Sequence, residues 1–408
     1  MRISTQLHGR DAGQLRRAKV GVTAAFIAHA VMFSSWAAYI PQVKAELGLS
    51  DAALGMALFG APVGSVVAMV LSHWTLPRWG SHRLVPITVA GYAAAGVTVG
   101  LATSGPLLFL ALALWGSFMG GLDVAMNTQA ATVERAVDAP IMPRFHGMWG
   151  VGALLGALIG AGSVSVGFGL TAQLAVLGVI VLVVVVPLTR HLVPDARQAA
   201  VAPDAPPTKR AFLTTTVAVL SAVVFVSILC ERTANDWSAN YLHEVVGAGP
   251  SVSALSYAAY TLMMVVTRFG ALPLRSRVSS RQLLPALALL AAVGMSVMLA
   301  TANPVVSVIG FASLGAGVAL LVPTAFSAAY SASSAGSAIA IVATTGCVGH
   351  LLGPPLIGQL AGLVGLPAAL ITIPVVLLIV AIVIRCSTAL DAAEEFHRDA
   401  TTPDRSPA

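Results

Sequence analysis

The isolated charge at Asp123 is the strongest chemical signal in this 408-residue chain. It is the only Asp, Glu, Lys or Arg between Arg83 and Glu134, and it lies in the segment GLDVAMN. An ionised aspartate at the centre of a bilayer costs roughly 2.5–3.5 kcal/mol on insertion scales, so such a residue usually faces a water-filled cavity, a partner or a proton. We expect a carboxyl group that binds and releases a proton. The alternative is a structural ion pair, for example with Arg232.

Asp123 is expected to share one face of a helix with other polar side chains. Residues three and four apart are neighbours on a helix surface. Asn127 therefore follows Asp123 along one stripe, and Glu134 ends that stripe at the predicted membrane edge.

A second polar cluster occurs in CERTANDW, residues 230–237. Glu231 is the second candidate for proton coupling, because alignment of Trp237 with Trp36 brings it near the membrane midplane. We interpret Asp236 as a substrate or gate contact; a cap at the outer membrane interface is the alternative. Aromatic walls of the same site are predicted at Trp36, Tyr39 and Trp237.

Motifs of enzymes that would compete with this interpretation do not occur. The chain has no G-x-x-x-x-G-K-[ST] phosphate loop, and Gly247 stands where a second zinc-binding histidine would follow His243-Glu244. It also has no G-x-S-x-G elbow. Its three cysteines, Cys230, Cys347 and Cys386, lack metal-ligand spacing. We therefore predict a protein that is not an enzyme, with no cofactor, metal site or disulfide.

The elements that position these residues are predicted to be membrane-spanning helices. Of all residues, 57% are hydrophobic and 9% charged, whereas soluble domains have about 25% charged residues. Apolar stretches long enough to cross about 30 Å of hydrocarbon recur throughout. Twelve helices are predicted near 19–43, 52–76, 84–104, 107–133, 145–168, 170–189, 212–242, 252–274, 283–301, 304–329, 337–363 and 367–384.

The basic residues support this count, because Lys and Arg collect in short cytoplasmic loops. With both termini in the cytoplasm, Lys44 is the one basic residue assigned to the outer side, and Arg232 lies within a helix. The net charge of +6 therefore reflects topology, and we predict no nucleic-acid partner. The first apolar stretch ends in YIPQVKAEL, which is not a signal-peptide cleavage site.

The two halves of the chain resemble each other. FSSWAAY at 33–39 is echoed by ANDWSANY at 234–241, and GALLG at 152–156 by GHLLG at 349–353. Asp123 corresponds to Gly317 in this repeat, so the fold does not require the acid. Glycines at 152, 156 and 160, and at 349 and 353, are expected to allow close helix packing. We predict a cytoplasmic segment at 1–18, six-helix bundles at 19–189 and 212–384, a linker at 190–211 and a tail at 385–408.

Six plus six helices, a basic linker and this repeat resemble the major facilitator superfamily over essentially the full chain. The loop PRWGSHR at 77–83 is similar to that family's cytoplasmic gate motif: Arg78 and Gly80 match, and Arg83 lies one place past the second basic position. Pro77 replaces the usual aspartate, so the bracing of the gate is not expected to work in the usual way.

GLDVAMN is similar to a helix-four motif of fucose permeases and nearby bacterial transporters. This resemblance implies that Asp123 is the proton-linked carboxylate and that Asn127 contacts a sugar. It also places His146 and Trp149 at substrate-contacting positions of helix five, and Ala37 where the family has a second acid. His350 is expected to be a polar spacer. These departures make fucose itself an unexpected substrate.

Together these observations predict a multi-pass protein of the bacterial inner membrane, monomeric and surrounded by lipid. We expect proton-coupled transport of a small solute by alternating access, such as sugar-like symport. Proton-antiport efflux of a drug-like metabolite and a non-transporting receptor are the alternatives.

Overall fold

The computed structural model describes residues 12–137, 139, 141–195, 215–275, 278–332, 337–387 and 389. Regular structure within these ranges is helical throughout, which confirms the predicted all-α class. The predicted amino-terminal segment and most of the predicted linker and tail lie outside the described residues.

The chain forms two compact units. The first comprises residues up to 200 together with 249–258, and the second comprises residues 201–248 and 259–408. The division at 200 lies within the predicted linker. Residues 249–258, which we predicted in the second bundle, are grouped with the first unit.

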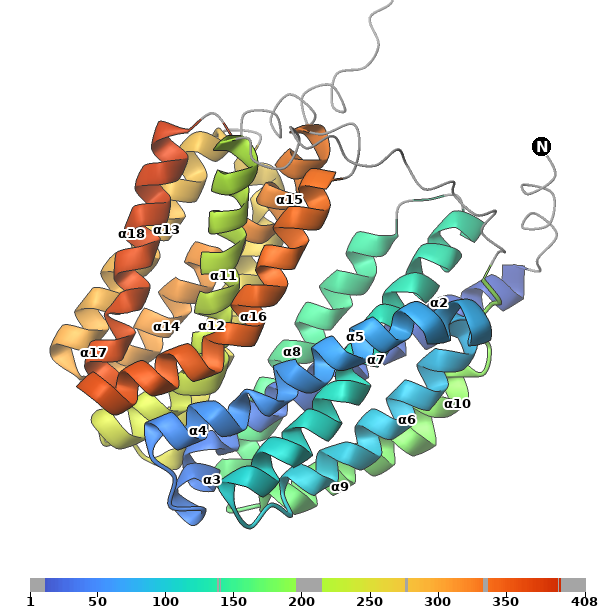
Figure 1. Ribbon diagram of the computed structural model, residues 1–408, viewed down its shortest axis with the longest axis horizontal. Coiled ribbons are helices and arrows are strands. Elements are labelled where there is room, and N and C mark those ends of the chain that lie inside the picture. The colour runs from blue at the N-terminus through green and yellow to red at the C-terminus, as the bar shows by residue number, and fades with distance from the viewer. Residues whose placement is uncertain are drawn as a thin grey trace, which may run out of the picture. The chain divides into compact units, whose positions relative to one another are not determined.

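The described part of the chain before the linker forms nine α-helices and two short helical turns (Figure 1). In chain order these are α2 (Ala12–Trp36), η1 (Ala37–Tyr39), α3 (Ile40–Glu46), α4 (Asp51–Leu58), α5 (Gly60–Trp79), α6 (Ser81–Val99), α7 (Gly105–Val137), α8 (Met142–Ser165), α9 (Leu170–Ile180), η2 (Val181–Val185) and α10 (Val186–Thr189).

The second unit contains most of the remaining helices, and α12 begins within residues 249–258. The helices after the linker are α11 (Thr215–Asn240), η4 (Tyr241–Val245), α12 (Pro250–Arg275), α13 (Ser280–Thr301), α14 (Pro304–Val318), α15 (Leu321–Ala332), α16 (Ser337–Val364), α17 (Leu366–Leu370) and α18 (Thr372–Cys386).

Eleven helices or helix pairs of the described chain are long and apolar enough to cross a membrane. The one predicted span that is missing from these eleven is 84–104. It corresponds to α6, whose first turn carries His82 and Arg83. The ends of two helices differ from the predicted ends. The predicted first helix, 19–43, extends over Gly13–Glu46, and the predicted tenth helix is divided between α14 and α15.

Glycines bring two helix pairs into close contact, one pair in each unit (Figure 1). In the first unit α8 packs on α2, and a Cβ added at Gly156 would lie 2.4 Å from the carbonyl oxygen of Val31. In the second unit α16 packs on α11, and a Cβ at Gly353 would lie 3.0 Å from Cβ of Arg232. The close packing expected from the glycine rows is therefore confirmed.

Lys44, which we assigned to the outer side, lies near the end of the first span and forms an ion pair with Asp51. Its Nζ lies 2.5 Å from Oδ1 of the aspartate. This pair neutralises the one basic residue that departs from the predicted charge pattern.

Candidate functional site

Asp123 lies near the middle of α7, on the face opposite the outward-facing leucines. Leu107, Leu110 and Leu114 are 48%, 60% and 46% exposed. Asp123 comes nine positions after Leu114, which is about two and a half turns at roughly 3.6 residues per turn. The Asp123 side chain is also exposed. It therefore faces the side of the first unit away from the leucine stripe.

Asn127 holds the Asp123 carboxylate in place. Its Nδ2 donates to the Asp123 carbonyl oxygen at 2.8 Å and to Oδ1 at 3.2 Å. Glu134, further along the same helix, accepts a hydrogen bond from the Met142 N–H and so ties α7 to the start of α8. The predicted stripe thus contains one accessible carboxylate with an amide partner and one carboxylate engaged by the next helix.

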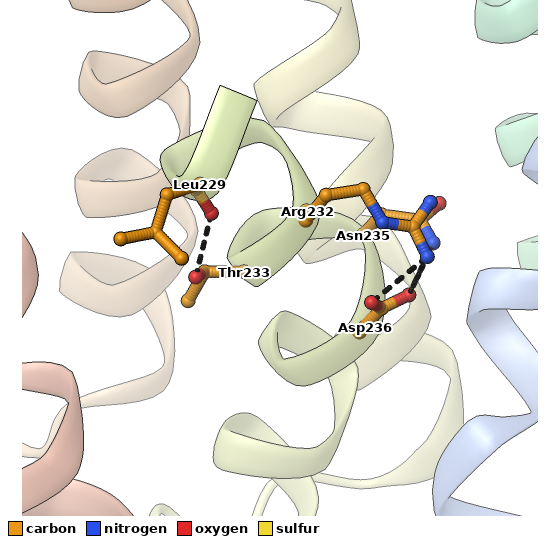
Figure 2. Close-up of polar contacts among 5 residues, drawn as sticks. All are labelled: Leu229, Arg232, Thr233, Asn235 and Asp236. Carbon is orange, nitrogen blue, oxygen red and sulfur yellow. Dashed lines mark hydrogen bonds and ion pairs between the residues drawn. The ribbon is translucent and has the colours of Figure 1, made fainter. Parts of the chain in front are cut away.

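The second unit contains a buried ion pair on α11 (Figure 2). Nη2 of Arg232 lies 3.0 Å from Oδ1 and 2.9 Å from Oδ2 of Asp236, and Nδ2 of Asn235 donates to the same Oδ1 at 2.6 Å. Arg232 is 5% and Asp236 1% exposed. Asp236, predicted to contact substrate, is therefore already engaged by two neighbours. The guanidinium proposed as an alternative partner for Asp123 pairs with Asp236.

Glu231 and Trp237 flank this pair on α11. Glu231 follows the central residue of the span Thr215–Val245, and its position near the membrane midplane stays a prediction. Trp237 is fully buried, and its indole nitrogen has no hydrogen-bond partner among the described residues. On α16, His350 lies three residues before Gly353, the glycine that packs against Arg232.

The other predicted aromatic walls differ in accessibility. Trp36 is 2% exposed, and Tyr39 is fully buried with its hydroxyl donating to the Phe168 carbonyl at 2.6 Å. Trp149 is half-buried and His146 is exposed on α8. His146 also packs edge-on against Phe26 of α2. Of the tryptophan and tyrosine residues predicted to contact substrate, Trp149 is the most accessible.

Trp149 is oriented by His29, a residue that the sequence interpretation missed. Its Nε1 lies 2.9 Å from Nδ1 of His29. The indole N–H can only donate, so Nδ1 must be unprotonated, and a neutral His29 carries its proton on Nε2. Nε2 is buried without a partner among the described residues. His29 also stacks on Tyr92, which stacks on Trp115.

The loop predicted to brace the gate is a single glycine between α5 and α6. Gly80 has φ +74°, a left-handed conformation that strains other residues. Arg78 and Arg83 on either side are exposed. The acid that is absent at Pro77 is replaced from another part of the chain: Asp195 accepts from Ser81 N at 2.6 Å.

Asp195 also binds two hydroxyl groups beside this loop. Its Oδ1 lies 2.5 Å from Oγ of Ser81 and 3.1 Å from Oγ1 of Thr132 on α7. A carboxylate at the first residues of α6 also compensates the positive end of the helix dipole. The loop thus has a carboxylate partner at residue 195 although Pro77 replaces its own acid, and the expectation that the gate is not braced in the usual way stays a prediction.

The two missed residues differ in how readily a sequence could reveal them. His29 is the only His, Asp, Glu, Lys or Arg between Lys19 and Lys44, the same signal that identified Asp123. Asp195 meets Ser81 across 114 positions, and no local pattern indicates that contact. Within the described residues no group of three His, Cys, Asp or Glu side chains is suited to hold a metal ion.

Known proteins resemble the chain over most of its length. An uncharacterized transporter of Sinorhizobium fredii is 33% identical over 352 residues, covering 84% of this chain and 90% of the relative. An uncharacterized MFS-type transporter of Yersinia pestis is 29% identical over 368 residues, covering 89% and 94%.

Solved structures show the same fold at low sequence identity. A point mutant of the nucleoside transporter NupG superposes with a TM-score of 0.70 at 14% identity, covering 90% of this chain and 98% of that one. A bacterial homolog of the human lysosomal transporter Spinster, in an inward-facing and unoccupied conformation, gives 0.69 at 16% identity, covering 98% and 100%.

The family model of the Major Facilitator Superfamily matches residues 21–354. Its members are transporters rather than enzymes, which confirms that prediction, and they bind small-molecule substrates within the lipid bilayer. With the helical architecture and the two relatives, this match identifies the chain as a multi-pass membrane transporter that belongs to the major facilitator superfamily.

Proposed function

We propose that this protein is a proton-coupled secondary transporter that moves a small polar solute across the bacterial inner membrane by alternating access. Asp123 carries the proposal. Its carboxylate is exposed on the face of α7 opposite the leucine stripe, and Asn127 is its one hydrogen-bond partner among the described residues. Protonation removes the cost of carrying this charge through a closed state, and deprotonation restores it.

The fixed charges elsewhere support this role for Asp123. Arg232 is neutralised by Asp236, and no cation is paired with the Asp123 carboxylate among the described residues. A proton is then the group that neutralises Asp123 when the site is closed to water. Glu231, near the centre of α11, is the second proton-binding candidate.

Polar groups near Asp123 favour a hydrophilic solute. Asn127 presents its amide beside the carboxylate. Together the two groups can donate to and accept from the hydroxyl groups of a sugar-like molecule. NupG is named a nucleoside transporter, so nucleosides belong beside sugars in the first screen of solutes.

Proton-antiport efflux of a drug-like metabolite is the second candidate. The half-buried ring of Trp149, which donates to His29, favours a flat apolar solute. Trp36, Trp237 and the stacked rings of Tyr92 and Trp115 are buried and contribute less to such a wall. Cells expressing the protein should accumulate a symported solute and should be depleted of an exported one.

The proposal is tested by Asp123→Asn in proteoliposomes loaded with the solute found in that screen. We expect the variant to lose accumulation driven by a pH gradient while it retains solute binding and exchange. The amide keeps the size and hydrogen bonding of the carboxyl but cannot carry the proton.

Two further variants serve as comparisons. Glu134→Gln removes another acid from α7 whose oxygen is engaged by Met142, and it should retain pH-driven accumulation. Glu231→Gln reports whether the second unit also carries protons. Undiminished pH-driven accumulation in Asp123→Asn would sink the proposal.

A further inference from the structure

A groove lies between α13 and α18 of the second unit, at the end of these helices predicted to face the cytoplasm. Its volume is about 560 Å³, within the range of roughly 300–1,000 Å³ for small-molecule sites. The two helices pack side by side (Figure 1). The residues that line its apolar part are Pro285, Ala286, Leu289, Ala381 and Ile382.

The apolar walls of the groove are open to the surroundings of the unit. Leu289 is 41% and Ile382 55% exposed. In a membrane-spanning helix such exposed apolar side chains favour contact with hydrocarbon rather than water. The groove therefore has the volume and chemistry to hold an acyl chain.

Positive charge gathers at one end of this groove. Arg385 lines it from the last turn of α18 and is exposed. Nε of Arg281 lies 3.4 Å from the carbonyl oxygen of Arg385, which brings a second guanidinium to the same end. The first residue of α13, Ser280, lies here as well, so the positive end of that helix dipole adds to the charge.

No carboxylate lines the groove within the part of the chain that is described. Two guanidinium groups and a helix N-terminus thus stand at one end of an apolar channel without an acidic side chain among its walls. Basic pockets between helices at the cytoplasmic membrane surface are suited to anionic lipid headgroups.

We propose that this groove binds an anionic phospholipid, with its phosphate against Arg385 and one acyl chain along α13 and α18. The shape and the charge select the occupant together: a soluble phosphate would leave the apolar channel unfilled, and an apolar solute would form no ion pair with the exposed Arg385. The site is distinct from the transport site and does not depend on proton coupling.

The test measures phospholipid retained by the full-length protein. The purified protein is equilibrated in mixed micelles with equal amounts of phosphatidylglycerol and phosphatidylethanolamine, and the bound lipids are counted by native mass spectrometry. We expect preferential retention of phosphatidylglycerol. Arg385→Gln should lower this retention about fivefold, because an arginine near an anionic lipid surface contributes about that factor.

Matched variants separate the groove from general lipid contact. Ala286→Trp fills the apolar channel and should lower retention, whereas Leu290→Trp, one turn along the same helix and 51% exposed, should not. Arg144→Gln removes an exposed arginine from the first unit and controls for net charge. Size-exclusion chromatography verifies that each variant is folded.

Two exposed cysteines offer an independent measurement on the unchanged chain. Cys386 lines the groove, whereas Cys347 on α16 does not. Phosphatidylglycerol should slow maleimide modification of Cys386 relative to Cys347, and phosphatidylethanolamine of the same chain length should not.

Three outcomes would overturn the proposal. One is equal retention of the two lipids by the unchanged protein, and another is unchanged phosphatidylglycerol retention in Arg385→Gln. The third is that the full-length chain binds no phosphatidylglycerol, whereas a chain truncated after Ala389 does. That result would mean that the acidic segment with Asp391, Glu394 and Glu395 occupies the groove in the full-length protein.

Discussion

The contact of α2 with α8 in the first unit has a counterpart in the contact of α11 with α16 in the second. Gly156 approaches the backbone of Val31, and Gly353, its partner in the repeat, approaches Arg232. A small residue is needed in both places because a Cβ would meet atoms of the facing helix. The helix packing of the repeat has thus been kept in both units.

The polar chemistry at these two contacts is different. Beside the first, Trp149 donates to His29; its counterpart at the same offset as the glycines is Gly346, where a Cβ would meet Val224 at 3.0 Å. Beside the second, Arg232 pairs with Asp236. The difference teaches that the repeat preserves the close approach of the helices, while each unit carries its own polar groups on that shared backbone.

The largest effect is expected from breaking the ion pair of the second unit. Arg232→Met leaves the Asp236 charge buried and uncompensated, which should cost about 3–5 kcal/mol of stability. The double variant with Asp236→Leu should recover most of this loss, because burial of two apolar side chains avoids the desolvation penalty. Thermal unfolding in detergent measures both.

The first unit supplies the comparison for this variant. Ser35→Ala on α2 removes a hydroxyl that donates to Met32 O at 3.0 Å, and it should cost no more than about 1 kcal/mol. If Arg232→Met and the double variant unfold at the same temperature, the buried Asp236 carboxylate does not carry the cost that we assign to it.

A smaller effect is expected from adding a methyl group to the two glycines. Gly156→Ala places Cβ 2.4 Å from a backbone oxygen, which moves only with its helix, and should destabilise by about 1–3 kcal/mol. Gly353→Ala meets an arginine Cβ at 3.0 Å and should cost less, because a small shift of the two helices relieves a contact at that longer distance.

Gly162→Ala is the control. Gly162 lies on the same helix, α8, and a Cβ added there would meet no atom within 4 Å. It should be neutral or stabilising by up to about 1 kcal/mol through helix propensity. Equal losses of stability in Gly156→Ala and Gly353→Ala would contradict the difference that we expect from the two distances.

The smallest effect is expected from the hydrogen bond that occurs only in the first unit. Trp149→Phe and His29→Phe should show a coupling energy of about 0.5–1.5 kcal/mol in a double-mutant cycle of unfolding in detergent. The cycle separates the bond from the loss of ring packing. If the effects of the two changes on stability are additive, His29 does not orient Trp149.

The sequence by itself determined the helical class, the repeat and the position of Asp123. An apolar run long enough to cross hydrocarbon must close its backbone hydrogen bonds as a helix, and a charge within it is costly enough to be noticeable. The same reasoning applied to His29 would have identified it as well.

Only the tertiary structure decided which polar groups meet. Asp236 has Arg232 one turn away on α11, but spacing alone does not exclude Asp123 as the partner of that arginine. Asp195 reaches Ser81 from a distant segment. Which polar side chains pair depends on which helix faces pack together. The free-energy cost of a charge in hydrocarbon makes a residue noticeable in the sequence, but it does not identify its neighbour on another helix.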